Sequence, residues 1–485
     1  MEGTMYEDRI RNAKLREKVM PAQDAARLVR DGMTIGASGF GRIGYPKAVS
    51  GIVAETKSAG DLTLICGASV GDELDGVLAR AGLMTRRYAY QTQADVREGI
   101  NRGRIRFADI HLSRLPQLIR KGFLGKVDMA ILECCLIKED GSFVPTLSVG
   151  ISDVLAECAG QVILELNLRH PVELAGLHDI ARADDCERVL DDPTGRAGGP
   201  SVPLDPDKIA AIVITDIPDQ NPSYAAPDET SRAIASHILR FLEGEIACGM
   251  LPAKFCLQSG VGLVANAVLD GLLESPLRGL RMYTEVIQDS VLPLLEKGVL
   301  DFASATSLCL SGEAEARFYA QYGFFHDKVV LRPQEVSNSG TLIRRFDLVA
   351  MNTAVEADIY GNINSTHLAG SSIFNGIGGS GDFARNAHLS MFMTPSVAKN
   401  GAVSCIVPMV THTDNAEHDV HILVTEQGFA DLRGLSPKER AACIIANCAH
   451  PDFRPKLQAY FDRACAQTGY AHTPHDLKTV FSWND

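Results

Sequence analysis

Residues 33–44 read Met-Thr-Ile-Gly-Ala-Ser-Gly-Phe-Gly-Arg-Ile-Gly, an apolar run that ends in closely spaced glycines. Tyr45-Pro-Lys-Ala-Val follows, so the pattern predicts a strand, a glycine-rich turn and then a helix. The same order begins again at Leu62-Thr-Leu-Ile-Cys-Gly-Ala-Ser69. Strands that alternate with helices form a mostly parallel sheet covered by helices on both faces. We therefore predict an α/β fold.

Short apolar runs of strand length recur in both halves of the chain. In the first half they lie at residues 127–133, 161–167 and 209–215. In the second half we predict strands at residues 254–258, 281–286, 328–331, 347–351, 403–408 and 420–425. A polar loop from Asp216 to Asp228 separates the two series. We therefore predict an N-terminal α/β domain over residues 1–220 and a C-terminal α/β domain over residues 221–485.

The composition argues against several classes of protein. The chain has 485 residues and a formal net charge of -13, whereas a nucleic-acid surface requires clustered Lys and Arg. It contains no run of about 18 apolar residues, so no membrane-spanning helix is expected. The start of the chain lacks the apolar segment of a secretory signal, and the cysteines form no CxxC pair. We therefore expect a cytoplasmic protein with no nucleic-acid or membrane partner.

One carboxylate lies among residues that otherwise read as core. Arg281-Met-Tyr-Thr-Glu285-Val-Ile-Gln-Asp-Ser290 predicts a short strand, and alternate side chains would put Tyr283 and Glu285 on one face. A buried carboxylate without a partner is costly. Glu285 is therefore either a candidate functional residue, a paired core residue or a surface residue at a strand end. The predicted C-terminal domain carries it.

Two glycine-rich turns lie in the same half of the chain as Glu285. Gln258-Ser-Gly-Val-Gly262 comes between a predicted strand and a predicted helix at residues 263–273, and Asn375-Gly-Ile-Gly-Gly-Ser-Gly381 is the second turn. Backbone N–H groups in such turns can closely approach a phosphate, a thioester oxygen or an oxyanion. The alternative for each is a tight turn that binds nothing.

Other kinds of site are less consistent with the sequence. Residues 376–381 match GxGxxG, but no acidic residue that could hold a ribose occurs between residues 383 and 413. The chain has no GxxxxGK[ST] phosphate loop and no GxSxG nucleophile elbow. His412, Asp414, His418 and His421 straddle a loop without the tight spacing of a histidine metal site. We therefore predict no metal site.

Several motifs in order along the chain identify a family resemblance. These motifs are Gln258-Ser-Gly-Val-Gly262, Tyr283-Thr-Glu-Val-Ile-Gln-Asp289, Gln334-Glu-Val-Ser-Asn-Ser339, Glu356-Ala-Asp-Ile-Tyr-Gly-Asn362, Asn375-Gly-Ile-Gly-Gly-Ser-Gly-Asp-Phe383 and Thr425-Glu-Gln-Gly-Phe-Ala-Asp-Leu-Arg-Gly434. With them, the chain resembles the acetyl-CoA hydrolase/transferase family of class I CoA-transferases, with succinyl-CoA:acetate CoA-transferase as the nearest member type. The N-terminal Ser38-Gly-Phe and Tyr45-Pro-Lys also match, so the resemblance covers nearly the whole chain.

The resemblance implies a role for individual residues. Glu285 would be the nucleophile, Val261 and Gly379 would donate backbone N–H groups to an oxyanion, and Asn338 would help to hold the carbonyl. Glu426 lies in a motif near the catalytic glutamate, and Ser69 and Thr92 would line a pocket for the small carboxylate. The positions that would contact CoA are Leu257, Gln258, Ser259, Gly260, Val261, Val355, Asn375, Gly379 and Lys399.

The resemblance also implies an architecture and an activity. The fold would consist of two open, mostly parallel α/β domains of the CoA-transferase superfamily (NagB/RpiA/CoA-transferase-like), and the protein would be a homodimer. CoA would be a substrate, with no cofactor, and would move between a short acyl-CoA, such as acetyl-CoA or succinyl-CoA, and a small carboxylate such as acetate. An acyl-CoA hydrolase that uses the same glutamate and a non-catalytic CoA-binding protein are the alternatives.

One loop departs from the family pattern. The resemblance leads us to expect an arginine for the distal carboxylate of succinate in the loop Thr215-Asp-Ile-Pro-Asp-Gln-Asn-Pro-Ser-Tyr224. This loop contains no arginine and carries Asp216 and Asp219. The sequence therefore leaves the acceptor open between succinate and a monocarboxylate such as propionate or butyrate.

Overall fold

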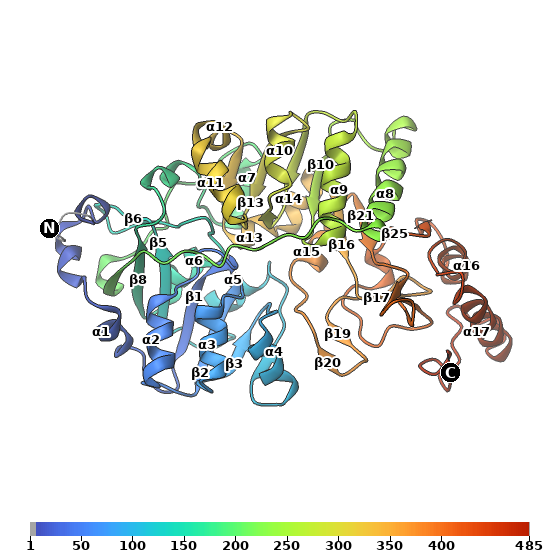
Figure 1. The fold of residues 1–485 in the computed structure, drawn as a ribbon, viewed down its shortest axis with the longest axis horizontal. Helices are drawn as coiled ribbons and strands as arrows, with labels where there is room; N and C mark the ends of the chain where they lie inside the picture. The colour runs from blue at the N-terminus through green and yellow to red at the C-terminus, as the bar shows by residue number, and fades with distance from the viewer. Residues whose placement is uncertain (1–5, 485) are drawn as a thin grey trace. The chain divides into compact units, whose positions relative to one another are not determined.

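The computed structural model describes residues 6–484 and confirms the predicted α/β class, with two large, mostly parallel sheets (Figure 1). The first sheet has seven strands in the order β4-β3-β2-β1-β5-β8-β9, and each printed pair of neighbours is parallel. Its strands are β1 (Thr34–Gly41), β2 (Leu62–Ser69), β3 (Met84–Tyr88), β4 (Arg106–Ala108), β5 (Met129–Cys134), β8 (Gln161–Asn167) and β9 (Ile209–Thr215).

Helices cover both faces of this sheet. Ile35 and Ala37 of β1 lie in one apolar cluster with Val49 of α2 (Ala48–Thr56). Gly36, between them, points to the other face, where an added Cβ would lie 2.4 Å from Leu155 of α6 (Ser152–Cys158). The central strand β1 is therefore buried on both sides, which explains its apolar sequence.

The second large sheet has eight strands in the order β15-β13-β11-β10-β16-β21-β25-β26. The last pair is antiparallel, at one edge of a sheet whose other printed pairs are parallel. The strands are β10 (Cys256–Ser259), β11 (Leu280–Tyr283), β13 (Leu300–Ala305), β15 (Val329–Leu331), β16 (Val349–Thr353), β21 (Leu389–Met393), β25 (Ile422–Thr425) and β26 (Gly428–Asp431).

In the second half of the chain, a predicted helix is present and a predicted strand is interrupted. The predicted helix after β10 is confirmed as α9 (Leu263–Glu274), which lies beside α8 (Glu229–Ala247) in Figure 1. The predicted strand at residues 403–408 is wrong, because the chain there forms β23 (Val403–Ser404) and β24 (Ile406–Val407), which belong to separate small sheets. The apolar run is interrupted at Cys405, whose backbone N–H turns to the carbonyl of Ser396.

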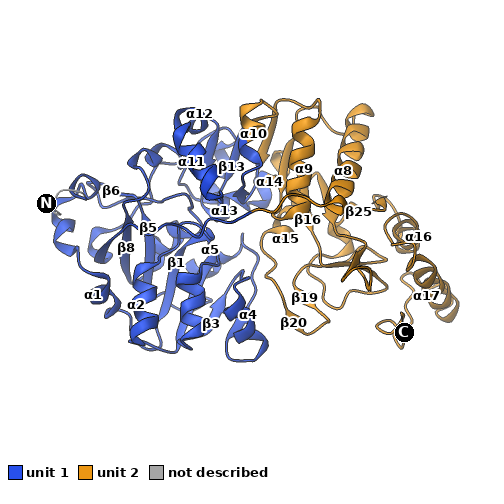
Figure 2. Ribbon diagram, viewed as in Figure 1, with its two compact units in different colours: residues 1–223, 283–292, 302–342 blue, residues 224–282, 293–301, 343–485 orange. Residues whose placement is uncertain are grey.

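The chain divides into two compact units (Figure 2). Unit 1 contains Met1–Ser223, Tyr283–Leu292 and Phe302–Leu342, and unit 2 contains Tyr224–Met282, Pro293–Asp301 and Ile343–Asp485. The first boundary, at Ser223, lies near the predicted division at residue 220. After this boundary the chain passes between the two units more than once. Glu285 therefore belongs to unit 1, although it lies in the second half of the sequence.

No helix among residues 6–484 is both long enough and apolar enough to cross a membrane.

Candidate active site

Glu285 lies in a bend between β11 and β12 (Val286–Ile287). Its carbonyl oxygen accepts hydrogen bonds from the backbone N–H groups of Thr306 and Ser307, at 3.0 and 3.1 Å. The prediction of one strand through residues 281–286 is therefore wrong, and Tyr283 and Glu285 do not share a strand face. The strand ends at Tyr283 because the next peptides turn to meet residues 304–307.

The Glu285 side chain is half-buried and has a specific hydrogen-bond donor. Asn338 Nδ2 donates to Glu285 Oε1 over 2.7 Å, and Asn338 itself is fully buried. A donor to a carboxylate stabilises its ionised form and fixes the direction of one oxygen. The Tyr283 hydroxyl donates to the carbonyl of Val336, which ties the end of β11 to the same helical turn. The structure thus brings together the predicted nucleophile and one predicted partner.

The short helix before Asn338 is held from several directions. It is α13 (Gln334–Ser337), and the backbone N–H of Gln334 donates to Gly150 over 2.8 Å. Arg120 donates two hydrogen bonds, of 2.6 and 3.0 Å, to the Glu335 carboxylate. Gln334 Nε2 also donates to the carbonyl of Leu112, at 2.9 Å. These contacts fix the helical turn that places Asn338.

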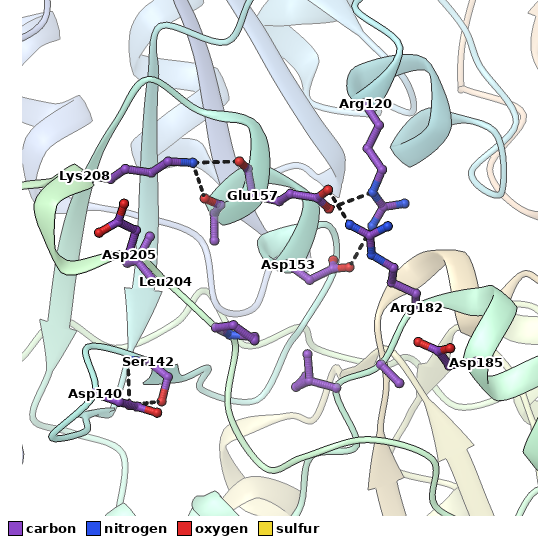
Figure 3. Close-up of a pocket in the computed structure, with 14 residues that line it drawn as sticks. Arg120, Asp140, Ser142, Asp153, Glu157, Arg182, Asp185, Leu204, Asp205 and Lys208 are labelled. Carbon is purple, nitrogen blue, oxygen red and sulfur yellow. Dashed lines mark hydrogen bonds and ion pairs between the residues drawn. The ribbon is translucent and has the colours of Figure 1, made fainter.

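Arg120 also forms part of a charged pocket of about 560 Å³ in unit 1. In Figure 3, Arg120 and Arg182 both point to Glu157, and Lys208 donates to two backbone carbonyls. Burial, together with the nearby charge of Glu335, raises the pKa of Asp153. The cations of this pocket are thus already bound by groups of the protein, and none of the predicted site residues lines it.

The predicted carboxylate pocket lies at the carboxyl ends of neighbouring strands of unit 1. Ser69 is the last residue of β2 and is fully buried, and Thr92 lies in the loop after β3. The Arg87 guanidinium donates to the carbonyls of Ser69 and Tyr90, at 3.0 and 3.1 Å, so it holds the two strand ends together. Within residues 6–484, the Ser69 hydroxyl has no hydrogen-bond partner.

Gln91 is a further candidate at this edge that the sequence analysis missed. It is fully buried, and neither its amide oxygen nor its amide nitrogen finds a hydrogen-bond partner in the described part of the chain. A buried amide normally has partners, so these atoms are suited to a polar ligand. A glutamine in a polar loop gives no signal in a single sequence, because only the fold shows that it is buried.

The first glycine-rich turn of unit 2 is placed as predicted, between β10 and α9. Val261 is 52% exposed, and Gly262 has a φ of 112°, in the region that favours glycine. Gln258 is instead buried, and its Oε1 accepts a 3.1 Å hydrogen bond from the backbone of Met351. Leu257 is fully buried as well. The side chains of Leu257, Gln258 and Ser259 are therefore buried, Gly260 is half-buried, and Val261 is exposed at the surface of the turn.

The remaining predicted residues also belong to unit 2. Gly379 immediately precedes α15 (Ser380–Asn386), and Lys399 is exposed in the hairpin between β22 (Val397–Ala398) and β23. Val355 and Asn375 lie in loops and are half-buried. The described structure therefore places Ser69, Thr92, Glu285 and Asn338 in unit 1, and the predicted oxyanion and CoA residues in unit 2.

Glu426 is held by hydrogen bonds within unit 2. Its carboxylate accepts a 2.8 Å hydrogen bond from the backbone N–H of Ser396 and a second bond from the Ser396 hydroxyl. Burial alone would raise the pKa of Glu426, but these hydrogen bonds outweigh burial and lower it. Glu426 is therefore an ionised carboxylate that fixes the backbone beside it.

The structure also contains a buried cluster of potential metal ligands that the sequence did not indicate. Glu133, His170 and Asp219 have possible ligand atoms within 4.8 Å of one another. Lys47 Nζ lies 2.5 Å from Glu133 and 2.8 Å from Asp219, so an ammonium group already takes the place of a cation. The residues that the sequence analysis considered as metal ligands have different partners in the structure. His412 lies near Asp414, whereas His421 Nδ1 accepts a hydrogen bond from the backbone N–H of Ser390.

Solved structures define the class of fold. RipA from Yersinia pestis superposes with a TM-score of 0.71 at 22% identity, covering 94% of this chain and 99% of that chain. A 4-hydroxybutyrate CoA-transferase from Porphyromonas gingivalis superposes with a TM-score of 0.65 at 21% identity, covering 92% of this chain and 98% of that chain. These likenesses confirm the predicted fold of two open, mostly parallel α/β sheets.

Sequence comparisons give the family. The acetyl-CoA hydrolase/transferase N-terminal domain matches residues 4–214, and the C-terminal domain matches residues 315–461. A succinyl-CoA:acetate CoA-transferase of Clostridium kluyveri is 46% identical over 99% of this chain and 90% of its own. An acetyl-CoA hydrolase of Schizosaccharomyces pombe is 42% identical over 99% of this chain and 96% of its own. The chain belongs to the acetyl-CoA hydrolase/transferase family and is an enzyme of that family.

Proposed function

We propose that this enzyme is a CoA-transferase that moves CoA between a short acyl-CoA, such as acetyl-CoA or succinyl-CoA, and a small carboxylate such as acetate. The observation that carries the proposal is the Glu285 carboxylate, fixed at the backbone by Thr306 and Ser307 and oriented by Asn338. The likeness to the Clostridium kluyveri transferase supports this choice.

A carboxylate nucleophile explains how thioester energy is kept. An oxygen of Glu285 attacks the acyl-CoA carbonyl, the C–S bond breaks, and a mixed anhydride and a CoA thiolate form. The thiolate then attacks the glutamyl carbonyl and breaks the anhydride, which gives a glutamyl-CoA thioester and releases the donor acid. The acceptor carboxylate repeats these steps in reverse order, and the thiolate finally attacks the new acyl carbonyl and frees Glu285. Atoms and charges balance without an added cofactor.

Each addition produces an oxyanion that needs donors. We assign this role to the backbone N–H groups of Val261 and Gly379, and we assign Asn338 to the reacting carbonyl. One preorganised donor of this kind lowers a barrier by about 3 kcal/mol. We further assign Ser69 and Thr92 to the carboxylate pocket and Glu426 to support of the site. The residues that we assign to CoA are Leu257, Gln258, Ser259, Gly260, Val261, Val355, Asn375, Gly379 and Lys399. We further propose that the enzyme is a cytoplasmic homodimer.

Trapping the thioester tests the proposal. The enzyme is incubated with acetyl-CoA, and intact mass is measured before and after borohydride treatment. We expect a CoA adduct that maps to Glu285 and is absent from Glu285→Gln, while Glu274→Gln, at the exposed end of α9, keeps the adduct. An adduct on another residue, or full transfer by Glu285→Gln, contradicts the assignment.

An acyl-CoA hydrolase that uses the same glutamate is the second candidate, favoured by the 42% identity to the Schizosaccharomyces pombe hydrolase. The two functions differ in what attacks the thioester intermediate. A transferase releases little CoA from acetyl-CoA until a carboxylate is added, and then forms a new acyl-CoA. A hydrolase releases CoA at the same rate with or without the acid.

A further inference from the structure

Arg42 is a cation at the carboxyl edge of the first sheet. It directly follows β1 and its side chain is exposed. Among residues 6–484, no hydrogen bond or ion pair holds its guanidinium. The nearby Asp72 is already bound by Arg80 through two hydrogen bonds, of 2.6 and 2.8 Å. The charge of Arg42 contributes to the lowered pKa of Asp72, after the hydrogen bond and charge of Arg80, but no described carboxylate forms an ion pair with Arg42.

The turn that carries Arg42 packs against the segment that holds Glu285. Ser307, whose N–H donates to the Glu285 carbonyl, also donates from its hydroxyl to the carbonyl of Phe40, at 3.4 Å. An added Cβ on Gly41 would lie 2.9 Å from the sulfur of Cys309. Residues 40–42 and residues 307–309 are thus in direct contact within unit 1. Only one contacting segment separates Arg42 from the proposed nucleophile.

Arg42 also adjoins the candidate carboxylate pocket. In the parallel register of β1 and β2, Gly41 pairs with Ser69, so Arg42 follows the residue beside Ser69. The Ser69 hydroxyl and the Gln91 amide are buried polar groups without hydrogen-bond partners in the described residues. A cation and unsatisfied polar atoms therefore occur at the carboxyl ends of the neighbouring strands β1, β2 and β3, as a polar anionic ligand requires.

The loop without an arginine is anchored over this same turn. Asp219 Oδ1 accepts the backbone N–H of Gly44, at 3.1 Å, and Gln220 Oε1 accepts the backbone N–H of Asp72, at 3.1 Å. Asp219 is paired with the buried Lys47 at 2.8 Å, and its own side chain is buried, so it is not an ion-pair partner of the exposed Arg42. The loop itself has no arginine, but the turn to which it is bound carries a positive charge on Arg42.

We propose that Arg42 binds the distal carboxylate of a dicarboxylate substrate of the succinate class while the other carboxyl group reacts at Glu285. The proposal rests on the proposed function and names the substrate class of that site. A guanidinium matches a carboxylate with two parallel hydrogen bonds, and a monocarboxylate offers no second group to bind. Arg42 is then a specificity-determining residue.

The test compares acceptors that differ in the distal carboxylate. CoA transfer from acetyl-CoA to succinate and to propionate is measured as kcat/KM for the wild type, Arg42→Leu and Arg42→Lys. We expect Arg42→Leu to lose about 10- to 100-fold toward succinate and less than about threefold toward propionate. Arg42→Lys keeps part of the succinate activity, since it retains charge but not the paired geometry. Retained propionate turnover shows that each variant is folded.

Matched arginines serve as controls. Arg30→Leu removes an exposed arginine just before β1, at the opposite end of the same strand, and Arg169→Leu removes one that follows β8. Neither is expected to change the ratio of succinate to propionate activity. An equal loss toward both acids in Arg42→Leu, the main loss in Arg169→Leu, or a wild type that uses propionate but not succinate overturns this proposal alone. A wild type that transfers CoA to no acid overturns the proposed function as well.

Discussion

Asn338 Nδ2 lies 2.7 Å from Glu285 Oε1 and donates a hydrogen bond to it across 53 positions of sequence. The bond fixes one oxygen of the carboxylate that we propose as the nucleophile. Asn338 can hold this position because it is fully buried at the end of a helical turn that other residues fix. The relationship gives the proposed nucleophile a defined direction before any substrate binds.

Removal of this donor should slow the reaction. We expect Asn338→Ala to lower kcat by about 10²- to 10³-fold, the cost of losing one preorganised donor. Asn338→Asp should be slower still, because a second carboxylate beside Glu285 repels its charge. Steady-state kinetics with acetyl-CoA measures both effects. The exposed Asn447→Ala serves as a control, and a kcat for Asn338→Ala within about twofold of wild type would contradict the assignment.

The Arg120–Glu335 pair should act through the position of Asn338. Glu335→Gln and Arg120→Met each remove part of the clamp on α13 and should lower kcat by about tenfold, with the affinity for CoA unchanged. Kinetics and CoA titration separate the two quantities. Arg182→Met, which removes another cation of the pocket in Figure 3 without touching Glu335, is the matched control. Equal losses in all three variants would show a general effect of the pocket.

The buried Lys47 should stabilise unit 1. Lys47 lies between the carboxylates of Glu133 and Asp219, and all three side chains are at most 1% exposed. Lys47→Met leaves both carboxylates without their cation, so the free energy of unfolding should fall by about 3–5 kcal/mol. Urea denaturation at neutral pH measures this. A double variant, Lys47→Met with Asp219→Asn, should recover part of the loss, and no recovery would mean that the charges are not coupled.

His421 makes stability depend on pH. Burial and the charges of Arg433 and Arg440 lower its pKa below the ordinary value, and its Nδ1 accepts a backbone N–H from Ser390. The unfolded state therefore binds a proton at a higher pH than the folded state, so the contribution of His421 to stability falls as the pH drops below about 6.5. Urea denaturation at pH 7 and pH 5 should show a smaller decrease for His421→Gln than for wild type. An identical decrease in both would exclude this histidine as a cause.

The sequence predicted the larger features of the fold better than the details at Glu285. The strands near residues 161–167 and 209–215 and the helix after β10 are confirmed, because apolar periodicity is a local property of the chain. The prediction of one strand through Glu285 is wrong because the peptides there form hydrogen bonds with residues 304–307. No local sequence pattern indicates such contacts. Gln91 was missed for the same reason, since burial is set by the whole fold.

By itself, the sequence determined the alternation of strands and helices, the positions of the glycine-rich turns and the motifs that place Glu285 in its family. These follow from side-chain period, from backbone torsions that favour glycine, and from residue order. Only the tertiary structure decided that Glu285 belongs to unit 1, that Asn338 binds it, and that Arg42 follows the residue paired with Ser69 at the edge of the sheet. The physical reason is that hydrogen bonds and burial join residues far apart in the chain, which only the folded backbone brings together.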